Sequence, residues 1–227
     1  MKKLNKRVTC IILARKNSKR IKNKNTLKIN NKPLIQYTIE SVNKSKSVNN
    51  SYLFTDDFKI KKLCGKEVKF IKRPKVISGD KISSDETIFY FIKKNLNLKI
   101  NDTIVFLQPT SPIRDNNDID KALNIFFRKK FDTLFSCYKD KSLFWIRKGN
   151  KLKPINYTPK RRQREQNMDD QYIENGSIYI FNREKFLKQR TRLFGKIGVY
   201  EMRKDQSFQV DQKIDIKIIK KFINDKK

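Results

Sequence analysis

The sequence predicts an α/β fold in which helices cover both faces of a largely parallel sheet. Short apolar runs such as residues 8–14 and 103–107 are hydrophobic on both sides of the pleat, which is typical of strands buried on both faces. These runs alternate with amphipathic helical segments, which favours a parallel sheet. Of the 227 residues, 37% are hydrophobic and 11% aromatic, enough to build a core although 34% are charged.

The first half of the chain predicts three strands and three helices in alternation. After the strand at 8–14 and a lysine-rich loop, Leu34, Ile35, Ile39 and Val42 form one helical stripe behind Pro33. Further strands are expected at 52–55, ended by Asp56 and Asp57, and at 68–71, with a short helix at 58–64 between them that stops at Gly65. A helix near 85–96 follows.

The second half continues the alternation around an insert. Strands are expected at 103–107, 132–138, 177–181 and 197–202, with helices near 118–129 and 183–188 and a last helix from about Lys213 whose Ile214, Ile218 and Phe222 share one face. The insert is a hairpin that turns at Gly149 and Asn150, followed by a basic loop at 157–166. We expect one domain over residues 1–227, with residues 139–172 as an arm for dimerisation or acceptor binding.

The charge and the cysteines limit the partners and the location. A net charge of +32 ordinarily suggests nucleic acid, but the lysines are scattered, whereas phosphate tracking needs them on one face. Nucleic acid is therefore not expected as a partner, whereas a polyanionic small substrate would be attracted. No apolar stretch approaches eighteen residues, so neither a membrane span nor a secretory signal is expected, and the location expected is cytoplasmic.

Cys10, Cys64 and Cys137 lie far apart in a chain without histidine, which favours reduced, buried thiols over a zinc site.

The segment at 13–25 has the composition of an anion-binding loop. It follows a buried strand and combines arginine, lysine, serine and backbone amides, as binding a triphosphate requires. The glycines of the Walker loop and of the dinucleotide fingerprint are missing. From composition alone, a solvated lysine-rich loop explains the segment equally well.

This segment resembles the signature of the acylneuraminate cytidylyltransferases (CMP-N-acetylneuraminate or CMP-nonulosonate synthetases). Four further segments agree with that family in order and spacing, and the resemblance spans nearly the whole chain: residues 72–74 with 83–85, residues 107–114, residues 172–180, and residues 207–211. Their joint occurrence is more specific than any one of them. The resemblance implies a Rossmann-like nucleotide-diphospho-sugar transferase fold with a mixed, mostly parallel sheet.

The resemblance also implies roles for individual residues. The CTP-binding positions fall on Leu13, Ala14, Arg15, Ser18, Lys19, Lys24, Asn25, Arg73 and Ser84. Among these, Arg15 and Lys24 are expected to act in catalysis by neutralising charge on the leaving pyrophosphate, and Asp211 is expected to act by binding the metal ion. Residues 83–86 also fit a helix capping box, and both roles can hold because a helix N-terminus is itself an anion site.

The acceptor sugar is implied to contact Gln108, Arg162, Gln163 and Tyr172. Gln108 follows the strand at 103–107, where the two prolines of the segment also fit a rigid turn. Arginine in the basic loop suits bidentate binding of a substrate carboxylate, and a flexible solvated loop is the alternative.

Asp211 is the candidate ligand for the expected cofactor, Mg²⁺, because this hard cation prefers carboxylate oxygens and few protein ligands. Some family members carry Asp-x-Asp here, whereas this chain has Gln209, which would hold a metal-bound water and coordinate more weakly. Asp56, Asp57 and Asp215 are interpreted as loop or cap residues, and Asn175 with Gly176 as a tight turn.

The function implied is transfer of CMP from CTP to a nine-carbon 3-deoxy sugar acid, with release of pyrophosphate, by a homodimer. Because the chain has no histidine, the general base would be a carboxylate, a metal-bound hydroxide or solvent. The alternatives are an eight-carbon acceptor of the Kdo type, legionaminate or pseudaminate as the acceptor, a nucleic-acid-binding protein on the same fold, and a catalytically weak relative.

Overall fold

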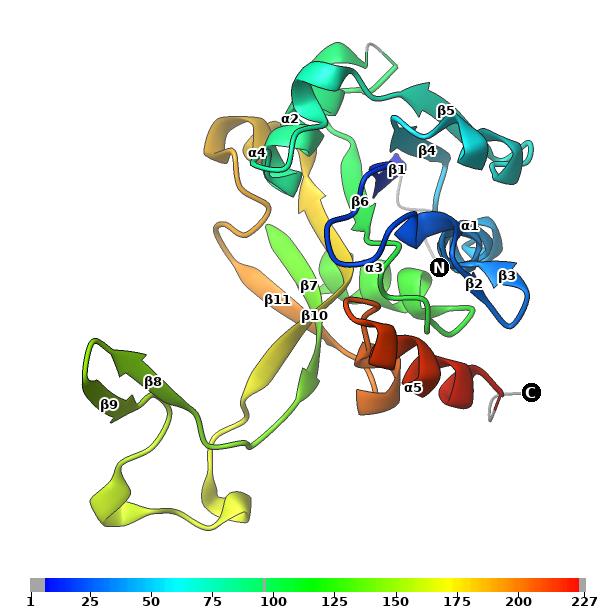
Figure 1. Ribbon diagram of the computed structural model, residues 1–227. Coiled ribbons are helices and arrows are strands. Elements are labelled where there is room, and N and C mark those ends of the chain that lie inside the picture. The colour runs from blue at the N-terminus through cyan, green and yellow to red at the C-terminus, as the bar shows by residue number, and fades with distance from the viewer. Residues whose placement is uncertain (1–6, 96, 225–227) are drawn as a thin grey trace.

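The computed structural model describes residues 7–95 and 97–224, and in this part of the chain the main sheet has seven strands in the order β11-β7-β10-β6-β1-β4-β5 (Figure 1). The strands are β1 (Val8–Ala14), β4 (Asn50–Thr55), β5 (Val68–Lys72), β6 (Thr103–Leu107), β7 (Thr133–Lys139), β10 (Tyr172–Asn182) and β11 (Ile197–Glu201). β10 runs antiparallel to β6 and β7, and the other neighbours are parallel. The predicted α/β class with a mostly parallel sheet is confirmed.

Helices pack on both faces of the sheet, as predicted. On one face α1 (Leu34–Lys44) and α3 (Asp118–Arg128) contribute Ile39 and Leu123 to a core shared with β1, β6 and β10. On the other face α2 (Ser84–Lys94) and α4 (Arg183–Gln189) contribute Phe91 and Phe186. Strands covered on both faces need apolar residues at every position, which explains the runs of hydrophobic residues in β1 and β6.

The order of the strands creates a crevice between β1 and β6. From β1 the chain crosses by α1 to β4, on one face, and from β5 it crosses by α2 to β6, on the other face and on the other side of β1. The loops that leave β1 and β6 therefore diverge. In open α/β sheets, ligands bind at such a switch point, outside the carboxyl ends of the strands.

Several predicted elements differ in detail. The short helix expected at residues 58–64 is a 3-10 helix, η2 (Phe58–Leu63). Helix α2 ends at Lys94, and Leu96, where the sequence predicted its end, lies outside the described residues. Pro33 precedes α1 and pairs in a small hairpin, β2 (Lys28–Ile29) with β3 (Lys32–Pro33), that the sequence did not predict. The remaining short 3-10 helices are η1 (Lys24–Thr26), η3 (Lys75–Ile77), η4 (Pro159–Arg161), η5 (Glu165–Asn167) and η6 (Lys204–Ser207).

One prediction was wrong because tertiary pairing overrides local pattern. Asn175 and Gly176 do not form a turn before a strand; they lie inside β10, where the register with β7 shifts between Glu174 and Tyr179. The predicted last helix is α5 (Lys213–Asn224), in which Ile214 is 54% exposed. The face that packs carries Ile216, Ile219, Phe222 and Ile223.

Helix α5 holds the loop after β1 and the segment before α5 together. Its buried Ile219 packs in a small cluster with Ile21, Ile29 and Val210. Ile21 and Val210 belong to two segments that the sequence predicts to be functional, residues 13–25 and 207–211. Burial of these apolar side chains therefore brings the two segments together.

The predicted hairpin is confirmed and belongs to an arm that projects from the sheet (Figure 1). Its strands are β8 (Trp145–Lys148) and β9 (Lys151–Pro154), and Gly149 turns the chain with a φ of +59°, a conformation that favours glycine. The arm exposes several large apolar side chains, namely Phe144, Trp145, Ile146, Leu152 and Ile155. None of the described helices is both long and apolar enough to cross a bilayer.

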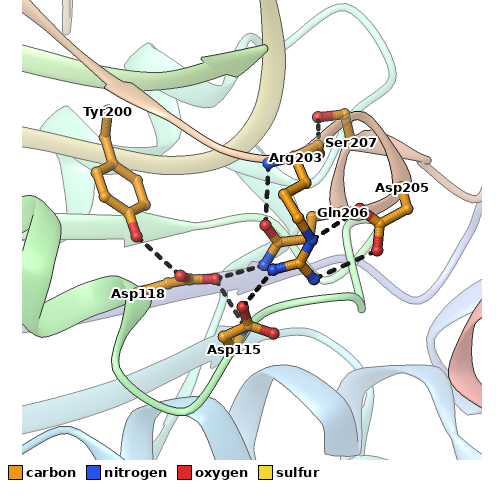
Figure 2. Close-up of polar contacts among 7 residues, drawn as sticks. All are labelled: Asp115, Asp118, Tyr200, Arg203, Asp205, Gln206 and Ser207. Atoms are coloured by element: carbon orange, nitrogen blue, oxygen red, sulfur yellow. Dashed lines mark hydrogen bonds and ion pairs between the residues drawn. The ribbon is translucent and has the colours of Figure 1, made fainter. Parts of the chain in front are cut away.

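A buried carboxylate joins α3 to the segment that follows β11 (Figure 2). Asp118 accepts hydrogen bonds from Tyr200 Oη at 2.8 Å, from Gln206 Nε2 at 3.0 Å and from the backbone amide of Asp115 at 2.7 Å. Arg203 donates to Asp115 and to Asp205. Burial of Tyr200 and the nearby Asp118 carboxylate raise the pKa of the Tyr200 hydroxyl, so it stays a donor. The network sets the path of the chain into residues 207–211.

We predict that Asp118→Ala destabilises the fold by about 3 kcal/mol, because it leaves three donors without their buried acceptor. Urea unfolding measures this difference. The control is Asp205→Ala, which removes a more exposed partner of Arg203 in the same network and should cost less than about 1 kcal/mol. Equal unfolding free energies for the two variants would show that the buried carboxylate has no special weight.

The three cysteines are free and buried, as predicted. Burial raises the pKa of the thiols of Cys10 and Cys137 to about 12 and that of Cys64 above its ordinary value. Since the thiolate is the reactive form, we predict that a thiol reagent at pH 8 leaves all three unmodified in the folded protein and labels all three in urea. Rapid labelling of any cysteine in the folded protein would contradict the burial shown here.

Candidate functional site

A cavity of about 290 Å³ opens at the carboxyl ends of β1 and β6, at the switch point of the sheet. Its lining comes from both loops that leave these strands, from the start of α2 and from the segment before α5: Leu13, Arg15, Ser18, Lys24, Asn25, Ser84, Phe106, Gln108, Pro109, Thr110, Gln209 and Asp211. Nine of the residues singled out in the sequence thus meet in one place, although they are spread over almost the whole chain.

The loop after β1 has a defined shape held by hydrogen bonds. Asn25 Nδ2 donates to the carbonyl of Arg15 at 2.9 Å, which closes the loop on itself. The amide of Lys16 donates to Asp56 Oδ1 at 2.7 Å, so the residue that follows β4 also holds the loop. Asn23 adopts a φ of +55° where the chain enters η1. The candidate cations are therefore carried on a fixed backbone.

Two carboxylates neutralise the cations around the cavity. Lys24 has a side chain only 11% exposed, and its Nζ donates to the carbonyl of Val210 at 2.7 Å and to Asp211 Oδ1 at 3.0 Å. Arg15 Nη1 lies 2.7 Å from Asp80 Oδ1. The same carboxylates attract the more exposed Arg20, 3.5 Å from Asp211, and Lys19, 3.2 Å from Asp80.

These ion pairs leave room for an anionic ligand. The carboxylates of Asp80 and Asp211 are 44% and 43% exposed, and pairs in such partly solvated positions are worth little. A ligand with several negative charges can therefore replace one carboxylate at Arg15 or Lys24 at small cost. The arrangement is chemically suited to bind a polyphosphate.

The N-terminus of α2 adds a second source of positive potential. Ser83 Oγ accepts from the amide of Glu86 at 3.1 Å, and Glu86 Oε2 accepts from the amide of Ser83 at 2.7 Å, which confirms the predicted capping box. Hydrogen bonds from Ser83 lower the pKa of Glu86. Ser84, the first residue of the helix, lines the cavity, so the positive end of the helix dipole faces the space.

The loop after β6 is held in place by a partly buried arginine, Arg114. Arg114 Nη2 donates to the carbonyl of Gln108 at 2.9 Å and to the carbonyl of Ser177 at 2.8 Å, and its Nη1 donates to Thr38 Oγ1 at 3.0 Å. Burial lowers the pKa of Arg114 to about 10, so it remains charged at neutral pH. Gln108, Pro109 and Thr110 thus form a rigid wall of the cavity.

Three of the residues predicted to bind the nucleotide are not part of the lining. Ala14 is buried at the end of β1, and Lys19 has a side chain 69% exposed beside Asp80. Arg73 is 5% exposed; it donates through Nε to the carbonyl of Ile77 at 2.9 Å and through Nη2 to Thr87 Oγ1 at 3.0 Å. Burial lowers the pKa of Arg73. In this structure its guanidinium braces the chain between β5 and α2.

The arm residues also lie away from the cavity lining of the single chain. Arg162 and Gln163 are exposed on the basic loop. Tyr172, 40% exposed, begins β10 with Lys139 Nζ 5.9 Å from its ring centre. The structure therefore does not bring these three side chains to Gln108.

The remaining acidic candidates act as caps, as predicted. Asp57 accepts from the amide of Lys59 at the start of η2. Asp215 accepts from the amides of Asp211 at 2.8 Å and Gln212 at 2.6 Å, which holds the turn into α5. Asp215 therefore supports Asp211 without facing the cavity.

Sequence reasoning missed Phe106, Pro109, Thr110 and Asp80 among the residues of the site. Phe106 lies one residue before the end of β6, and its sequence context gave no other signal of a functional role. Pro109 and Thr110 belong to residues 107–114, a segment that the resemblance had singled out, so both could have been predicted to line the site. Nothing in the sequence pairs Asp80 with Arg15, since the contact joins two loops 65 residues apart.

Comparison with known proteins identifies relatives over nearly the whole chain. A cytidylyltransferase family model matches residues 9–226. The post-translational flagellin modification protein B of Campylobacter coli is 32% identical, and the alignment covers 96% of both chains. N-acylneuraminate cytidylyltransferases of Oncorhynchus mykiss and of Escherichia coli O18:K1:H7 are 31% and 30% identical over 92% and 93% of this chain. The chain spans about half the length of these two relatives, 48% and 51%.

Solved structures share the fold at low identity. A CMP:2-keto-3-deoxy-manno-octonic acid synthetase complexed with CTP superimposes with a TM-score of 0.69 at 17% identity, over 97% of this chain and all of the other. A 4-diphosphocytidyl-2C-methyl-D-erythritol synthase from Anaerococcus prevotii gives a TM-score of 0.71 at 12% identity, over 96% of both chains. The expected nucleotide-sugar transferase fold is confirmed.

The fold, the cationic loop at its switch point and the match from residue 9 to residue 226 lead to one conclusion: this chain belongs to the cytidylyltransferase family.

Proposed function

We propose that this protein transfers CMP from CTP to a nine-carbon 3-deoxy sugar acid and releases pyrophosphate. The observation that carries the proposal is the cavity at the carboxyl ends of β1 and β6, which is lined by Arg15, Lys24, the N-terminus of α2 and Gln108. Such a cavity offers cations for the triphosphate of CTP and a polar side chain for an acceptor.

In this proposal the loop after β1 binds the triphosphate. Arg15 and Lys24 exchange their carboxylate partners for phosphate oxygens, and Ser18 and Asn25 donate hydrogen bonds. When the acceptor hydroxyl attacks the α-phosphate, charge moves onto the departing pyrophosphate, and both cations stabilise it there. Catalysis is then mostly positioning and electrostatic stabilisation, as is general for phosphoryl transfer.

A sugar acid is the acceptor class that the relatives support. The two N-acylneuraminate cytidylyltransferases carry that acceptor in their names, and the octonic acid synthetase of the same fold carries an eight-carbon sugar acid in its title. We propose the nine-carbon class because these two relatives, at 30–31% identity, are much closer than the solved structure at 17%. Gln108, on the wall held by Arg114, would contact the sugar.

We propose Mg²⁺ as the cofactor, held by Asp211 with Gln209 acting through a water. In the described part of the chain no three histidine, cysteine or acidic residues gather as a metal site. Mg²⁺ nevertheless fits here, because it is commonly bound by one or two carboxylates together with substrate phosphates, and the Asp211 carboxylate borders the cavity. The ion would neutralise charge on the phosphates when bound.

We propose that two copies associate through residues 139–172. The exposed Trp145, Ile146 and Leu152 of the hairpin make an apolar surface of the kind that marks an interface. Arg162, Gln163 and Tyr172 would then reach the acceptor side of the partner's cavity.

That residues 1–227 form one domain stays a prediction. Three free, buried thiols suit a reducing compartment, so we propose a cytoplasmic location.

Arg15→Ala and Lys24→Ala are each predicted to lower kcat/KM for pyrophosphate release from CTP about 100-fold or more, because each removes a cation from the leaving group. The assay is pyrophosphate release with a panel of sugar acids. Lys22→Ala, an exposed cation of the same loop outside the cavity lining, is the matched control and should leave the rate unchanged. Wild-type rates in the Arg15 and Lys24 variants would remove the loop from the mechanism.

Asp211→Asn is predicted to raise the Mg²⁺ concentration for half-maximal activity about 10-fold or more, since an amide is a poorer ligand than a carboxylate. The Mg²⁺ titration is made at saturating CTP, so that weaker binding of CTP, caused by the loss of the Asp211 contact with Lys24, does not change the measured Mg²⁺ requirement. Asp205→Asn, on η6 outside the cavity, serves as the control. An unchanged titration for Asp211→Asn would exclude this carboxylate as a ligand.

Trp145→Asp is predicted to weaken self-association about 10-fold or more, because a charge replaces a large apolar side chain at the centre of the proposed interface. Sedimentation across a concentration series measures the monomer–dimer constant. Val76→Asp, at a residue 74% exposed on η3, should not change it. A wild-type protein that stays monomeric, or an equal effect of both substitutions, would reject the arm as the interface.

A further inference from the structure

Two primary amides from distant segments converge on one glycine at the cavity. A Cβ placed on Gly176 would lie 2.7 Å from Oε1 of Gln108 and 2.9 Å from Nε2 of Gln209. Real Cβ atoms essentially never approach other atoms so closely, so any side chain here would displace both amides. We call the side chains of Gln108 and Gln209 the amide pair; both line the cavity.

Gly176 faces the amide pair because of an irregularity in β10. The strand pairs with β7 in one register up to Glu174 and in another from Tyr179, and between them Gly176 adopts a φ of +66°. A positive φ favours glycine, and an extra residue in one strand of a pair bends that strand and redirects its residues. The backbone of β10 therefore approaches the cavity without a side chain at this position.

Asn175 locks the irregularity in place. Its side chain is buried; Oδ1 accepts from Ser136 Oγ on β7 at 2.6 Å and from the amide of Ser177 at 3.2 Å. Its Nδ2 donates to Ser207 Oγ at 3.1 Å. A buried amide with these partners holds the backbone of its neighbour Gly176 in one conformation.

The segments that carry the amide pair are both fastened to this part of β10. Ser111, three residues after Gln108, donates through Oγ to the carbonyl of Asn175 at 3.3 Å. Ser207, two residues before Gln209, receives the hydrogen bond from Asn175. Arg114 joins the carbonyls of Gln108 and Ser177 from the other side. Both loops thus take their position relative to the cavity from the residues around Gly176.

We propose that Gly176 is a positioning residue for the acceptor: its missing side chain lets Gln108 and Gln209 lie together against β10 and so sets where the sugar acid is held. The inference rests on the proposed function and deepens it, because it assigns Gln209 to the acceptor side beside Gln108, in addition to its proposed contact with a metal-bound water. Together the amides offer donors and acceptors suited to the hydroxyl and carboxylate groups of a sugar acid.

The test compares Gly176→Ala with Gly65→Ala. Gly65 has nearly the same backbone conformation, with a φ of +65°, but a Cβ placed on it would meet nothing within 4 Å. Gly65→Ala therefore carries the backbone cost of a left-handed alanine without any contact. Both substitutions are made in the wild type and in a Gln108→Ala, Gln209→Ala background, in which the amide pair is absent.

The expected kinetic result is that Gly176→Ala raises KM for the sugar acid about 10-fold or more, whereas KM for CTP changes less than about threefold. Gly65→Ala should change neither constant. A general loss of structure would raise both KM values together, so equal effects on the two substrates would overturn the proposal, as would an effect no larger than that of Gly65→Ala.

The expected stability result is that Gly176→Ala and Gly65→Ala lower the Tm by similar amounts in both backgrounds, because the atoms that the new Cβ meets are the ends of flexible side chains and shift at little cost. A crystal structure of Gly176→Ala is expected to show both amides displaced from β10, and amides that keep their positions would overturn the proposal. A wild-type protein without turnover on any sugar acid would count against the proposed function, and this crystal structure would still decide whether the amide pair depends on Gly176.

Discussion

The Lys24 ammonium joins the first loop of the chain to its last segment, and the proposed site depends on this contact. Its Nζ holds the carbonyl of Val210 and the carboxylate of Asp211, 187 residues further along the chain. Packing of Ile21 and Val210 under α5 supports the contact from the apolar side. The phosphate-binding loop and the proposed metal ligand therefore form one unit, and a ligand that binds Lys24 also acts on Asp211.

The sequence predicted the sheet and its helices well because those features depend on local periodicity. Runs such as residues 8–14 and 103–107 can be buried only in the middle of a sheet, and both are central strands. It could not predict the irregularity at Asn175 and Gly176, which depends on the register between β10 and β7. In α5 the sequence showed that Ile214, Ile218 and Phe222 share a face, but the burial of Ile219 depends on its packing against Ile21 and Ile29, which no local pattern reveals.

Within the site, the sequence predicted the residue types but not their partners. The resemblance to the acylneuraminate cytidylyltransferases singled out Arg15, Lys24, Gln108 and Asp211, and the structure brings these four to one cavity. Asp80 could not be found, since its pairing with Arg15 joins two loops that no local pattern relates. For Arg73 the resemblance predicted a contact with the nucleotide, but its guanidinium is buried and donates hydrogen bonds to Ile77 and Thr87 instead. Charge patterns reveal candidates, and burial decides which of them face the ligand.

The central claim is that the loop from Arg15 to Asn25 binds the triphosphate of CTP at the switch point between β1 and β6. A crystal structure of the protein with CTP and Mg²⁺ tests it most directly. The account predicts phosphate oxygens within hydrogen-bond distance of Arg15 and Lys24, with the Asp80 partner displaced. CTP bound elsewhere, or these side chains still paired with Asp80 and Asp211 at a saturating concentration of the nucleotide, would contradict it.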